Sequence, residues 1–300
     1  MKVLVIGYGS IGAQHTRVLA SMENVKEVFV LSSQSNLPYP TINTLDEIIS
    51  IEPEYIVIAS VTSKHYEQLL FIEKNCHNKL IFVEKPLFAQ KEKIEITNNS
   101  VFIGYILRFN PVIQFIKKKC TGRKLWSINV FCGSYLPEWR KERDYRQTSS
   151  ASKELGGGVL LDLSHELDYI QWITGNIEPE HVVNRKVSDL EIDTDDQLIF
   201  TAKAQSGTYI QLSLNYFSRI PTRQIIIDGE GISIVADIIN NEVHINEDGN
   251  QDVFSWKKTV KDKMIKKQHE SVLKSDDTYL CTYREAGVVM NLIDKIQKWD

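Results

Sequence analysis

The chain has few of the features that mark membrane, secreted or nucleic-acid-binding proteins. Its apolar runs are only as long as a strand, and the run at the N-terminus ends at Gly7, too early for a signal-peptide core. Four cysteines are spread singly along 300 residues, which argues against a disulfide framework or a zinc site. The net charge is only -4, so we expect neither nucleic acid nor a membrane as a partner. These absences predict a cytoplasmic protein without a bound metal.

Strand-like and helix-like segments alternate through the first hundred residues. The strand-like segments lie at 2–6, 25–31, 55–60, 79–83 and 101–106, and the helix-like segments lie at 10–22, 45–50 and 64–75. Apolar strands separated by helices are typical of βαβ units, which form a parallel sheet covered on both faces. We therefore predict an α/β domain over residues 1–107.

The pattern changes near Arg108. A helix is predicted at 111–119, a long strand at 126–132, and a helix at 159–174 that Gly175 ends. Strands of antiparallel type follow at 197–204, 209–217, 223–228 and 232–237, and the tail at 286–299 has the pattern of an amphipathic helix. Residues 108–300 are therefore predicted to form an α+β domain with an open, mainly antiparallel sheet.

The strand that begins at Tyr209 has two faces of different character. Ile210, Leu212, Leu214 and Tyr216 share one face, which we expect to pack on helices. The other face mixes aromatic and polar residues and could meet solvent or a second subunit. Because a mixed face of this kind suits self-association, we expect a homodimer or homotetramer.

A glycine-rich turn joins the first predicted strand to the first predicted helix. It consists of Gly7, Tyr8, Gly9, Ser10, Ile11 and Gly12. In such a turn Gly7 allows the tight bend, Gly9 lets the backbone approach a pyrophosphate, and Gly12 lets the helix pack close to the strand. The free N–H groups and the dipole of the helix then favour the phosphates. Residues 1–107 are thus predicted to be a dinucleotide-binding Rossmann domain.

The residues after the second predicted strand bear on the choice between NAD and NADP. An acidic residue there would hold the ribose 2′-hydroxyl and favour NAD, but the chain reads Leu31-Ser32-Ser33-Gln34. Ser32 and Ser33 tolerate a 2′-phosphate, although no arginine stands beside them to pair with it. We expect NAD(P) as the cofactor, with a weak preference for NADP.

Two further clusters carry groups suited to proton transfer. Glu84-Lys85-Pro86 follow the strand at 79–83, whose carboxyl end faces the ligand crevice of a parallel sheet, so Lys85 could donate to a substrate hydroxyl. Asp162 and His165 are three residues apart on the predicted helix 159–174 and would share a face, which suits a proton relay. Read alone, either cluster could also be an ordinary surface pair.

Together these motifs resemble the Gfo/Idh/MocA family of NAD(P)-dependent oxidoreductases along the whole chain. The resemblance depends on Glu84-Lys85-Pro86, on the stretch from Gly104 to Pro111, on the glycine triplet before Asp162, and on the hairpin at 228–232. It implies a hydride transfer with the nicotinamide cofactor.

The resemblance also implies roles for particular residues. Lys85 would contact the substrate hydroxyl and the nicotinamide ribose, and His165 would be the acid/base with Asp162 assisting. Thr62, His65 and Glu84 would help to bind the cofactor. Relatives usually have four residues from the aspartate to the histidine, whereas this chain has three. Aligning on Asp162 places Glu166 at the histidine position, so Glu166 stays a rival to His165.

A segment after the strand at 126–132 bears on the substrate. It contains Tyr135, Trp139 and Tyr145 together with several arginines, and it resembles a branch of the family from bacterial surface-polysaccharide and sugar-nucleotide pathways. Aromatic platforms and arginines suit a sugar, so these three residues and Arg108 are candidate substrate-binding residues. A packed loop at a domain seam would have the same composition.

Three functions follow from these motifs. The first is hydride transfer between nicotinamide and a carbon of a sugar, sugar nucleotide or cyclitol, with Lys85, Asp162 and His165 handling the hydroxyl and its proton. The second uses tightly bound NAD for an elimination or a glycoside hydrolysis. The third is a non-catalytic cofactor-binding regulator or assembly protein, because a fold alone does not establish an activity.

Overall fold

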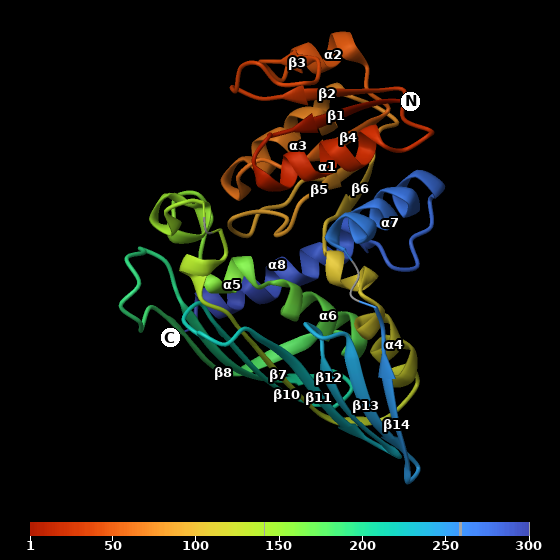
Figure 1. Cartoon of the computed structure of the whole chain (residues 1–300), viewed down its shortest axis with the longest axis vertical. Coiled ribbons are helices and arrows are strands. Elements are labelled where there is room, and N and C mark those ends of the chain that lie inside the picture. The colour runs from red at the N-terminus through yellow and green to blue at the C-terminus, as the bar shows by residue number, and fades with distance from the viewer. Residues whose placement is uncertain (141, 258–259, 300) are drawn as a thin grey trace. The chain divides into compact units, whose positions relative to one another are not determined.

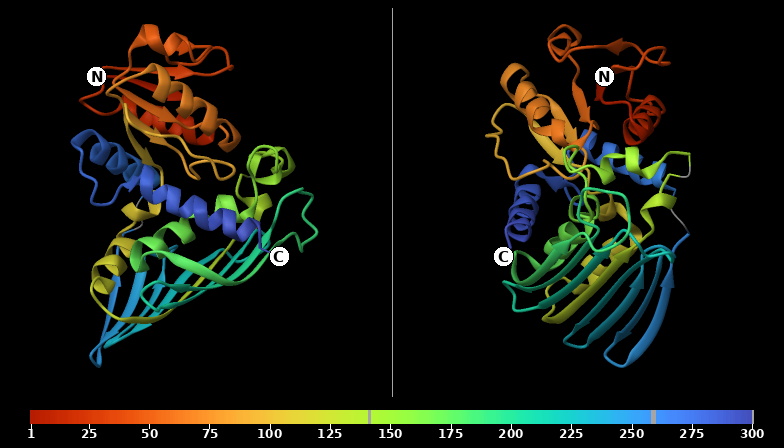
Figure 2. Two further views of the ribbon diagram at one scale, coloured as in Figure 1. Left: turned by 180° about the vertical axis from the view of Figure 1, so that it is seen from behind. Right: turned by 90° about the vertical axis from the view of Figure 1, so that its left-hand side faces the viewer.

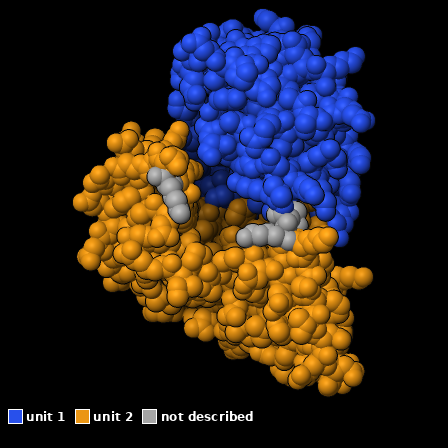
Figure 3. Space-filling model, viewed as in Figure 1, with its two compact units in different colours: residues 1–106, 260–287 blue, residues 107–259, 288–300 orange. Residues whose placement is uncertain are grey.

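The chain forms two compact units, drawn in different colours in Figure 3. The computed structural model describes residues 1–140, 142–257 and 260–299. Unit 1 comprises Met1–Ile106 and Val260–Gly287, and unit 2 comprises Leu107–Thr259 and Val288–Asp300. The sequence-based division at residue 107 did not assign the segment Val260–Gly287 to the N-terminal unit. Within the described residues, no helix is both long and apolar enough to cross a membrane.

Unit 1 is built on a seven-stranded sheet in the order β15-β6-β5-β4-β1-β2-β3 (Figure 1). Neighbouring strands from β1 to β6 pair in parallel, and β15 is antiparallel to β6 at the edge. The strands are β1 (Lys2–Ile6), β2 (Glu27–Leu31), β3 (Thr41–Ile42), β4 (Tyr55–Ile58), β5 (Leu80–Val83), β6 (Ser100–Ile103) and β15 (Cys281–Thr282). The predicted N-terminal parallel α/β fold is confirmed.

Helices cover both faces of this sheet. α1 (Ser10–Ala20) and α7 (Lys261–Lys274) contact each other and pack on one face, where α1 contacts β1 and β2 and α7 contacts β5. α3 (His65–Asn75) joins β4 to β5 by a right-handed crossover and lies on the opposite face from α1 (Figure 2). The short elements α2 (Glu47–Ile51) and η1 (Thr62–Lys64) complete the unit. The central strands are buried on both sides, which explains their continuous Val and Ile content.

Unit 2 contains an eight-stranded sheet in the order β14-β13-β12-β11-β7-β10-β9-β8. Only β7 and β10 pair in parallel, so the predicted open, mainly antiparallel sheet is confirmed. The strands are β7 (Leu125–Gly133), β8 (Ile177–Arg185), β9 (Gln197–Ala204), β10 (Tyr209–Asn215), β11 (Thr222–Gly229), β12 (Ile232–Asp237), β13 (Glu242–Glu247) and β14 (Asn250–Ser255).

One face of the unit 2 sheet is covered by α4 (Pro111–Cys120), α5 (Val159–Asp162) and α6 (His165–Thr174) (Figure 1). The side chains of Ile210, Leu212, Leu214 and Tyr216 lie on this face and are buried, as the sequence pattern indicates. Tyr209 on the other face is 54% exposed. The remaining elements are α8 (Tyr283–Gln297), which begins in unit 1, and the short turns η2 (Ile106–Phe109), η3 (Leu136–Glu138), η4 (Tyr145–Gln147) and η5 (Ser149–Ala151).

Candidate active site

The glycine turn between β1 and α1 has different constraints at its three glycines. Gly7 has a φ of 95°, and a Cβ there would lie 2.7 Å from the Cα of Ser60. A Cβ on Gly12 would lie 2.0 Å from the carbonyl oxygen of Gly7. A Cβ on Gly9 would meet no protein atom within 4 Å. Packing therefore requires glycine at positions 7 and 12, whereas at position 9 the protein leaves open space beside the backbone.

The start of α1 is suited to hold an anion. Gly9 is the N-cap and supplies no side-chain hydrogen bond, and the first turn, which begins with Ser10 and Ile11, contains no acidic residue. The N–H groups of this turn and the positive end of the helix dipole thus remain available to a phosphate. With the open space above Gly9, this arrangement fits the pyrophosphate of a dinucleotide cofactor.

The contrast between Gly9 and Gly12 gives a matched pair of variants. We expect Gly9→Ala to keep the melting temperature of the wild type and to weaken NADH binding by at least about tenfold, since the new methyl group occupies the pyrophosphate position. We expect Gly12→Ala to lower the melting temperature, because the clash is with backbone and no side chain can move to relieve it. Calorimetry and fluorescence titration measure the two effects. Equal melting temperatures for both variants would contradict this interpretation.

The loop after β2 carries no charged side chain from residue 32 to residue 36. Ser32 is buried and its hydroxyl accepts a hydrogen bond of 3.1 Å from the backbone N–H of Gln34. The side-chain amide of Gln34 donates to the carbonyl of Tyr8 at 3.0 Å, which ties this loop to the glycine turn. Ser33 is exposed. The loop thus offers the exposed hydroxyls of Ser33 and Ser35, and no carboxylate, for a ribose.

The turn after β5 contains Glu84, Lys85 and Pro86, and the Lys85–Pro86 peptide is cis. His65, at the start of α3, contacts this turn. Its Nδ1 lies 3.1 Å from the carbonyl oxygen of Pro86, and its Nε2 lies 3.3 Å from the carbonyl oxygen of Ser60. Burial lowers the pKa of His65, and the nearby carbonyls and Glu84 partly oppose this. His65 is buried and positions the turn, whereas Thr62 in η1 is partly exposed.

The predicted helix 159–174 is broken in the structure, so the expectation of one continuous helix is wrong. α5 ends at Asp162 and α6 begins at His165. Between them the backbone N–H groups of Ser164 and Glu166 donate to the carbonyls three residues earlier, at 3.4 and 3.3 Å. Bonds of this type make a 3₁₀-like turn, in which residues three apart are aligned. The tightened turn thus fits the three-residue spacing of Asp162 and His165.

Most polar side chains of this segment are buried. From residue 161 to 170, only Asp162 and His165 are not buried. Tyr216 donates its hydroxyl proton to Asp162 Oδ2 at 2.6 Å, and burial together with the Asp162 charge raises the pKa of Tyr216 well above its usual value. The phenol therefore stays protonated and fixes the Asp162 carboxylate as an acceptor.

Asp195 is a second carboxyl group near Asp162. Its Oδ2 accepts the N–H of Leu160 at 2.9 Å, at the start of α5. Gly158 has a φ of 115°, and a Cβ there would lie 2.3 Å from Asp195 Oδ1, which explains the last glycine of the triplet. Burial and the negative charges of Asp162 and Asp196 raise the pKa of Asp195. No sequence motif pointed to this residue, because it lies 33 positions from Asp162 and outside the triplet.

Glu166 is held in an ion pair inside unit 2. Its side chain is fully buried, and its two oxygens accept from Nε and Nη2 of Arg223 on β11 at 2.6 and 3.0 Å. The carboxylate therefore binds α6 to the sheet. This arrangement favours His165 over Glu166 as the group that meets a substrate.

The candidate substrate residues of unit 2 have different surroundings. Trp139 and Tyr145 line one small hollow with Leu136, Arg140, Thr148 and Ser150. The guanidinium of Arg219 lies 3.9 Å from the ring centre of Tyr135. Arg108 is buried instead, in a bidentate ion pair with Asp168 and above the Trp172 ring. The structure thus brings Trp139 and Tyr145 together and places Arg108 in a structural pair.

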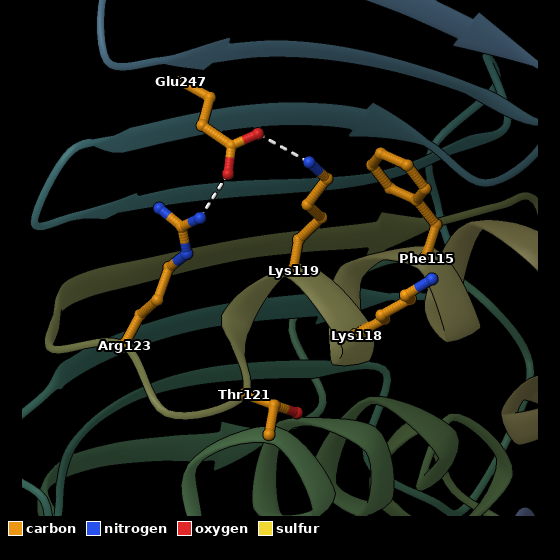
Figure 4. Close-up of a pocket in the computed structure, with 6 residues that line it drawn as sticks. All are labelled: Phe115, Lys118, Lys119, Thr121, Arg123 and Glu247. Atoms are coloured by element: carbon orange, nitrogen blue, oxygen red, sulfur yellow. Dashed lines mark hydrogen bonds and ion pairs between the residues drawn. The ribbon is translucent and has the colours of Figure 1, made fainter.

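A larger pocket in unit 2, of about 330 Å³, contains none of the predicted site residues (Figure 4). It is lined by Phe115, Lys118, Lys119, Thr121, Arg123 and Glu247. The Glu247 carboxylate accepts from Lys119 at 2.5 Å and also from Arg123, so it links β13 to the end of α4.

Comparison with known proteins identifies the family from both parts of the chain. The model described as the oxidoreductase family with an NAD-binding Rossmann fold matches residues 1–98, and the model described as the GFO/IDH/MocA C-terminal domain matches residues 121–235. The chain belongs to the Gfo/Idh/MocA family. The resemblance stated from the sequence is thereby confirmed, and the protein is an NAD-binding enzyme of an oxidoreductase family.

Relatives in the Gfo/Idh/MocA family have names that refer to sugars. The 2,7-anhydro-N-acetylneuraminate hydratase of Escherichia coli (strain K12) is 24% identical over 253 residues, which cover 78% of this chain and 67% of the relative. The structure of UDP-N-acetylglucosamine 3-dehydrogenase from Acidithiobacillus ferrooxidans matches with a TM-score of 0.79 at 18% identity, covering 99% of this chain and 96% of the other. Levoglucosan dehydrogenase in complex with NADH matches with a TM-score of 0.83 at 14% identity and the same coverage. These structural likenesses show the fold.

Proposed function

We propose that this member of the Gfo/Idh/MocA family transfers a hydride between nicotinamide and a hydroxyl-bearing carbon of a sugar, sugar nucleotide or cyclitol. The observation that carries the proposal is the turn between α5 and α6. There Asp162 and His165 are the two residues from 161 to 170 that are not buried, and their neighbour Glu166 is engaged by Arg223. A carboxylate and an imidazole that are both partly exposed suit proton transfer at a substrate hydroxyl.

The proposed roles follow from the chemistry of each side chain. Bound nicotinamide accepts or donates the hydride. Lys85 donates a hydrogen bond to the substrate oxygen, and His165 accepts the hydroxyl proton during oxidation and returns it during reduction. Asp162, fixed by the Tyr216 hydroxyl, orients the imidazole and stabilises its protonated form. Thr62 and the exposed Ser33 contact the cofactor. The turn after β5, which His65 contacts at Pro86, positions Lys85.

A carbohydrate substrate is supported by the aromatic side chains of Trp139 and Tyr145, which lie together at a hollow that is itself too small, at about 10 Å³, to hold a sugar. Flat aromatic rings beside an arginine suit the apolar face and hydroxyl groups of a sugar. Tyr135 with Arg219 provides a second aromatic and cationic pair in the same unit. The names of the relatives, which refer to an anhydro sugar acid, a sugar nucleotide and an anhydro sugar, agree with this substrate class.

The cofactor preference proposed from the loop after β2 is weakly toward NADP. The loop holds no carboxylate that would repel a 2′-phosphate, and the exposed hydroxyl of Ser33 can donate to one. No arginine is present there to make the preference strong. We expect the two dissociation constants to differ by less than about tenfold, or about 1.4 kcal/mol.

A second candidate function has one observation in its favour. The relative from Escherichia coli that matches by sequence is named a hydratase, so the same side chains could serve a reaction in which the cofactor is not consumed. In that case nicotinamide would oxidise a carbon transiently, an elimination or addition of water would follow, and the hydride would return to the same molecule.

One set of assays separates these functions. Purified protein is tested for bound nucleotide, titrated with NADH and with NADPH, and incubated with UDP-N-acetylglucosamine, levoglucosan and 2,7-anhydro-N-acetylneuraminate. Appearance of reduced cofactor in proportion to oxidised sugar supports the first function. Product formation over many turnovers without a net change in cofactor supports the second. Failure to bind either nucleotide overturns both.

We also propose that the exposed face of the unit 2 sheet pairs with a second copy of the chain. Trp126, Phe131, Tyr209 and Val235 are among the large side chains exposed in this sheet.

The four cysteines are free and buried, which fits the reducing compartment expected from the sequence.

A further inference from the structure

Four polar side chains of unit 1, from two helices, one strand and one turn, form a continuous row of hydrogen bonds. The hydroxyl of Tyr55 on β4 lies 2.7 Å from Nδ1 of His269 on α7. Nε2 of His269 lies 2.9 Å from Nδ1 of His15 on α1. Nε2 of His15 lies 2.8 Å from Oε1 of Glu84, the residue before Lys85. The row therefore runs from the centre of the sheet to the turn that carries Lys85.

The row is closed to water along most of its length. Tyr55, His15 and His269 are fully buried, and the Glu84 side chain is 15% exposed. Burial raises the pKa of Tyr55 well above its usual value and lowers the pKa of His269 well below its usual value. The phenol thus keeps its proton, and the His269 imidazole stays neutral.

These protonation states set the direction of every hydrogen bond. The Tyr55 hydroxyl has His269 Nδ1 as its partner among the described residues, so it donates its proton there. Neutral His269 must then carry its proton on Nε2 and donate to His15 Nδ1. His15 in turn carries its proton on Nε2 and donates to the Glu84 carboxylate. In the reverse direction, the buried Tyr55 proton would lack an acceptor in this row, which costs free energy.

The Glu84 carboxylate is enclosed by further groups. A Cβ on Gly104 would lie 2.8 Å from Glu84 Oε1, so the chain after β6 packs closely against this carboxylate. Burial would raise the pKa of Glu84, but the hydrogen bond from His15 and the positive charges of Lys261 and Lys85 lower it overall. The negative charge of Glu84 also acts on His65, where it raises the pKa of the imidazole against the larger effect of burial.

We propose that Tyr55, His269 and His15 form a directional relay that keeps Glu84 ionised and fixed, and that Glu84 thereby positions the Lys85 ammonium for turnover. The proposal rests on the proposed hydride-transfer function for the role of Lys85. It makes His269, which comes from the C-terminal segment of unit 1, a positioning residue for a lysine nearly two hundred residues earlier. Such a chain is stronger than isolated pairs because each hydrogen bond polarises the next.

A second contact between α7 and α1 provides the control. Asp262, at the start of α7, accepts from Gln14 at 2.5 Å and from Arg17 at 2.9 Å. Asp262→Asn weakens the docking of α7 without touching the relay. His269→Phe breaks the relay, whereas His269→Gln keeps a side-chain N–H that can donate to His15.

The first test needs no substrate. Nitrogen-15 spectra of the imidazoles and carbon-13 spectra of the Glu84 carboxyl group are recorded against pH for the wild type, for these three variants and for Tyr55→Phe. We expect both relay imidazoles of the wild type to carry their proton on Nε2, and we expect His269→Phe and Tyr55→Phe to raise the pKa of Glu84. His269→Gln and Asp262→Asn should leave it near the wild-type value. The relay is overturned if His269 carries its proton on Nδ1, or if the pKa of Glu84 in His269→Phe equals that of the wild type.

The second test measures turnover with whichever of the three probe sugars the wild type converts. We expect His269→Phe to lower kcat by at least about tenfold at an unchanged KM and to move the acid limb of the pH profile upward. The Gln and Asn variants should keep the wild-type profile. Loss of activity without a shift of the profile would reduce the row to a structural role. If no probe sugar reacts, the proposed function is in question, and the spectra alone decide whether the relay exists.

Discussion

Lys85→Met is expected to lower turnover by about 10³-fold while NADH binding stays close to that of the wild type. Methionine keeps the length and the apolar stem of lysine but removes the donor and the charge. A positioned acid or hydrogen-bond donor contributes about 10²–10⁴-fold to such reactions. We expect the cofactor to bind mainly at the glycine turn and the start of α1, which the substitution leaves intact. Steady-state kinetics and fluorescence titration measure the two quantities separately.

Lys64→Met is the matched control for this experiment. Lys64 lies in η1 of the same unit and is exposed. The change in charge and length is the same, so we expect turnover within about twofold of the wild type. If Lys85→Met turned over the sugar at the wild-type rate, Lys85 would have no part in the chemistry.

Arg223→Leu is expected to destabilise unit 2 by about 3 kcal/mol. The substitution leaves the fully buried Glu166 carboxylate without its bidentate partner, and removing one member of a buried ion pair has a cost of this order. Because Glu166 lies directly after His165, we also expect the start of α6 to shift and turnover to fall. Chemical denaturation followed by circular dichroism measures the loss, read from the unfolding transition of unit 2.

Arg146→Leu provides the comparison for an exposed ion pair. Arg146 binds Asp144 and Glu191 at the surface, at 2.7 Å in each case, with about half of its side chain accessible. Exposed pairs contribute little to stability, so the denaturation midpoint should stay that of the wild type. Equal losses for the two variants would show that the Glu166–Arg223 pair has no special role.

The Rossmann half of the molecule was readable from the sequence because its signals are local. Strands such as Val3 to Ile6 are apolar throughout, and the three glycines stand directly between a strand and a helix. The same holds for the alternating pattern of β10, whose inner and outer faces the sequence separates correctly. In each case the information lies within a few neighbouring residues.

Other features depend on contacts between distant residues and could not be predicted. Leu163 and Ser164 are ordinary residues in a helix, so nothing local predicts the break between α5 and α6. The Glu166 carboxylate is engaged by Arg223, which lies 57 positions later in the sequence. α7 is rich in lysine and has few apolar residues, so its pattern is weak. Its role becomes visible only where His269 meets His15 and Tyr55 in space.

The discontinuous make-up of unit 1 has a consequence for how the protein is made. When the ribosome has delivered residue 106, the sheet of unit 1 still lacks β15, and His15 and Tyr55 still lack His269. At about 5–20 residues per second, α7 follows only some 8–30 seconds later. During that interval the nascent nucleotide-binding half has an uncovered patch beside α1, where α7 later packs. A premature stop codon anywhere before codon 269 would leave this half permanently incomplete, even though every residue of the glycine turn had been translated.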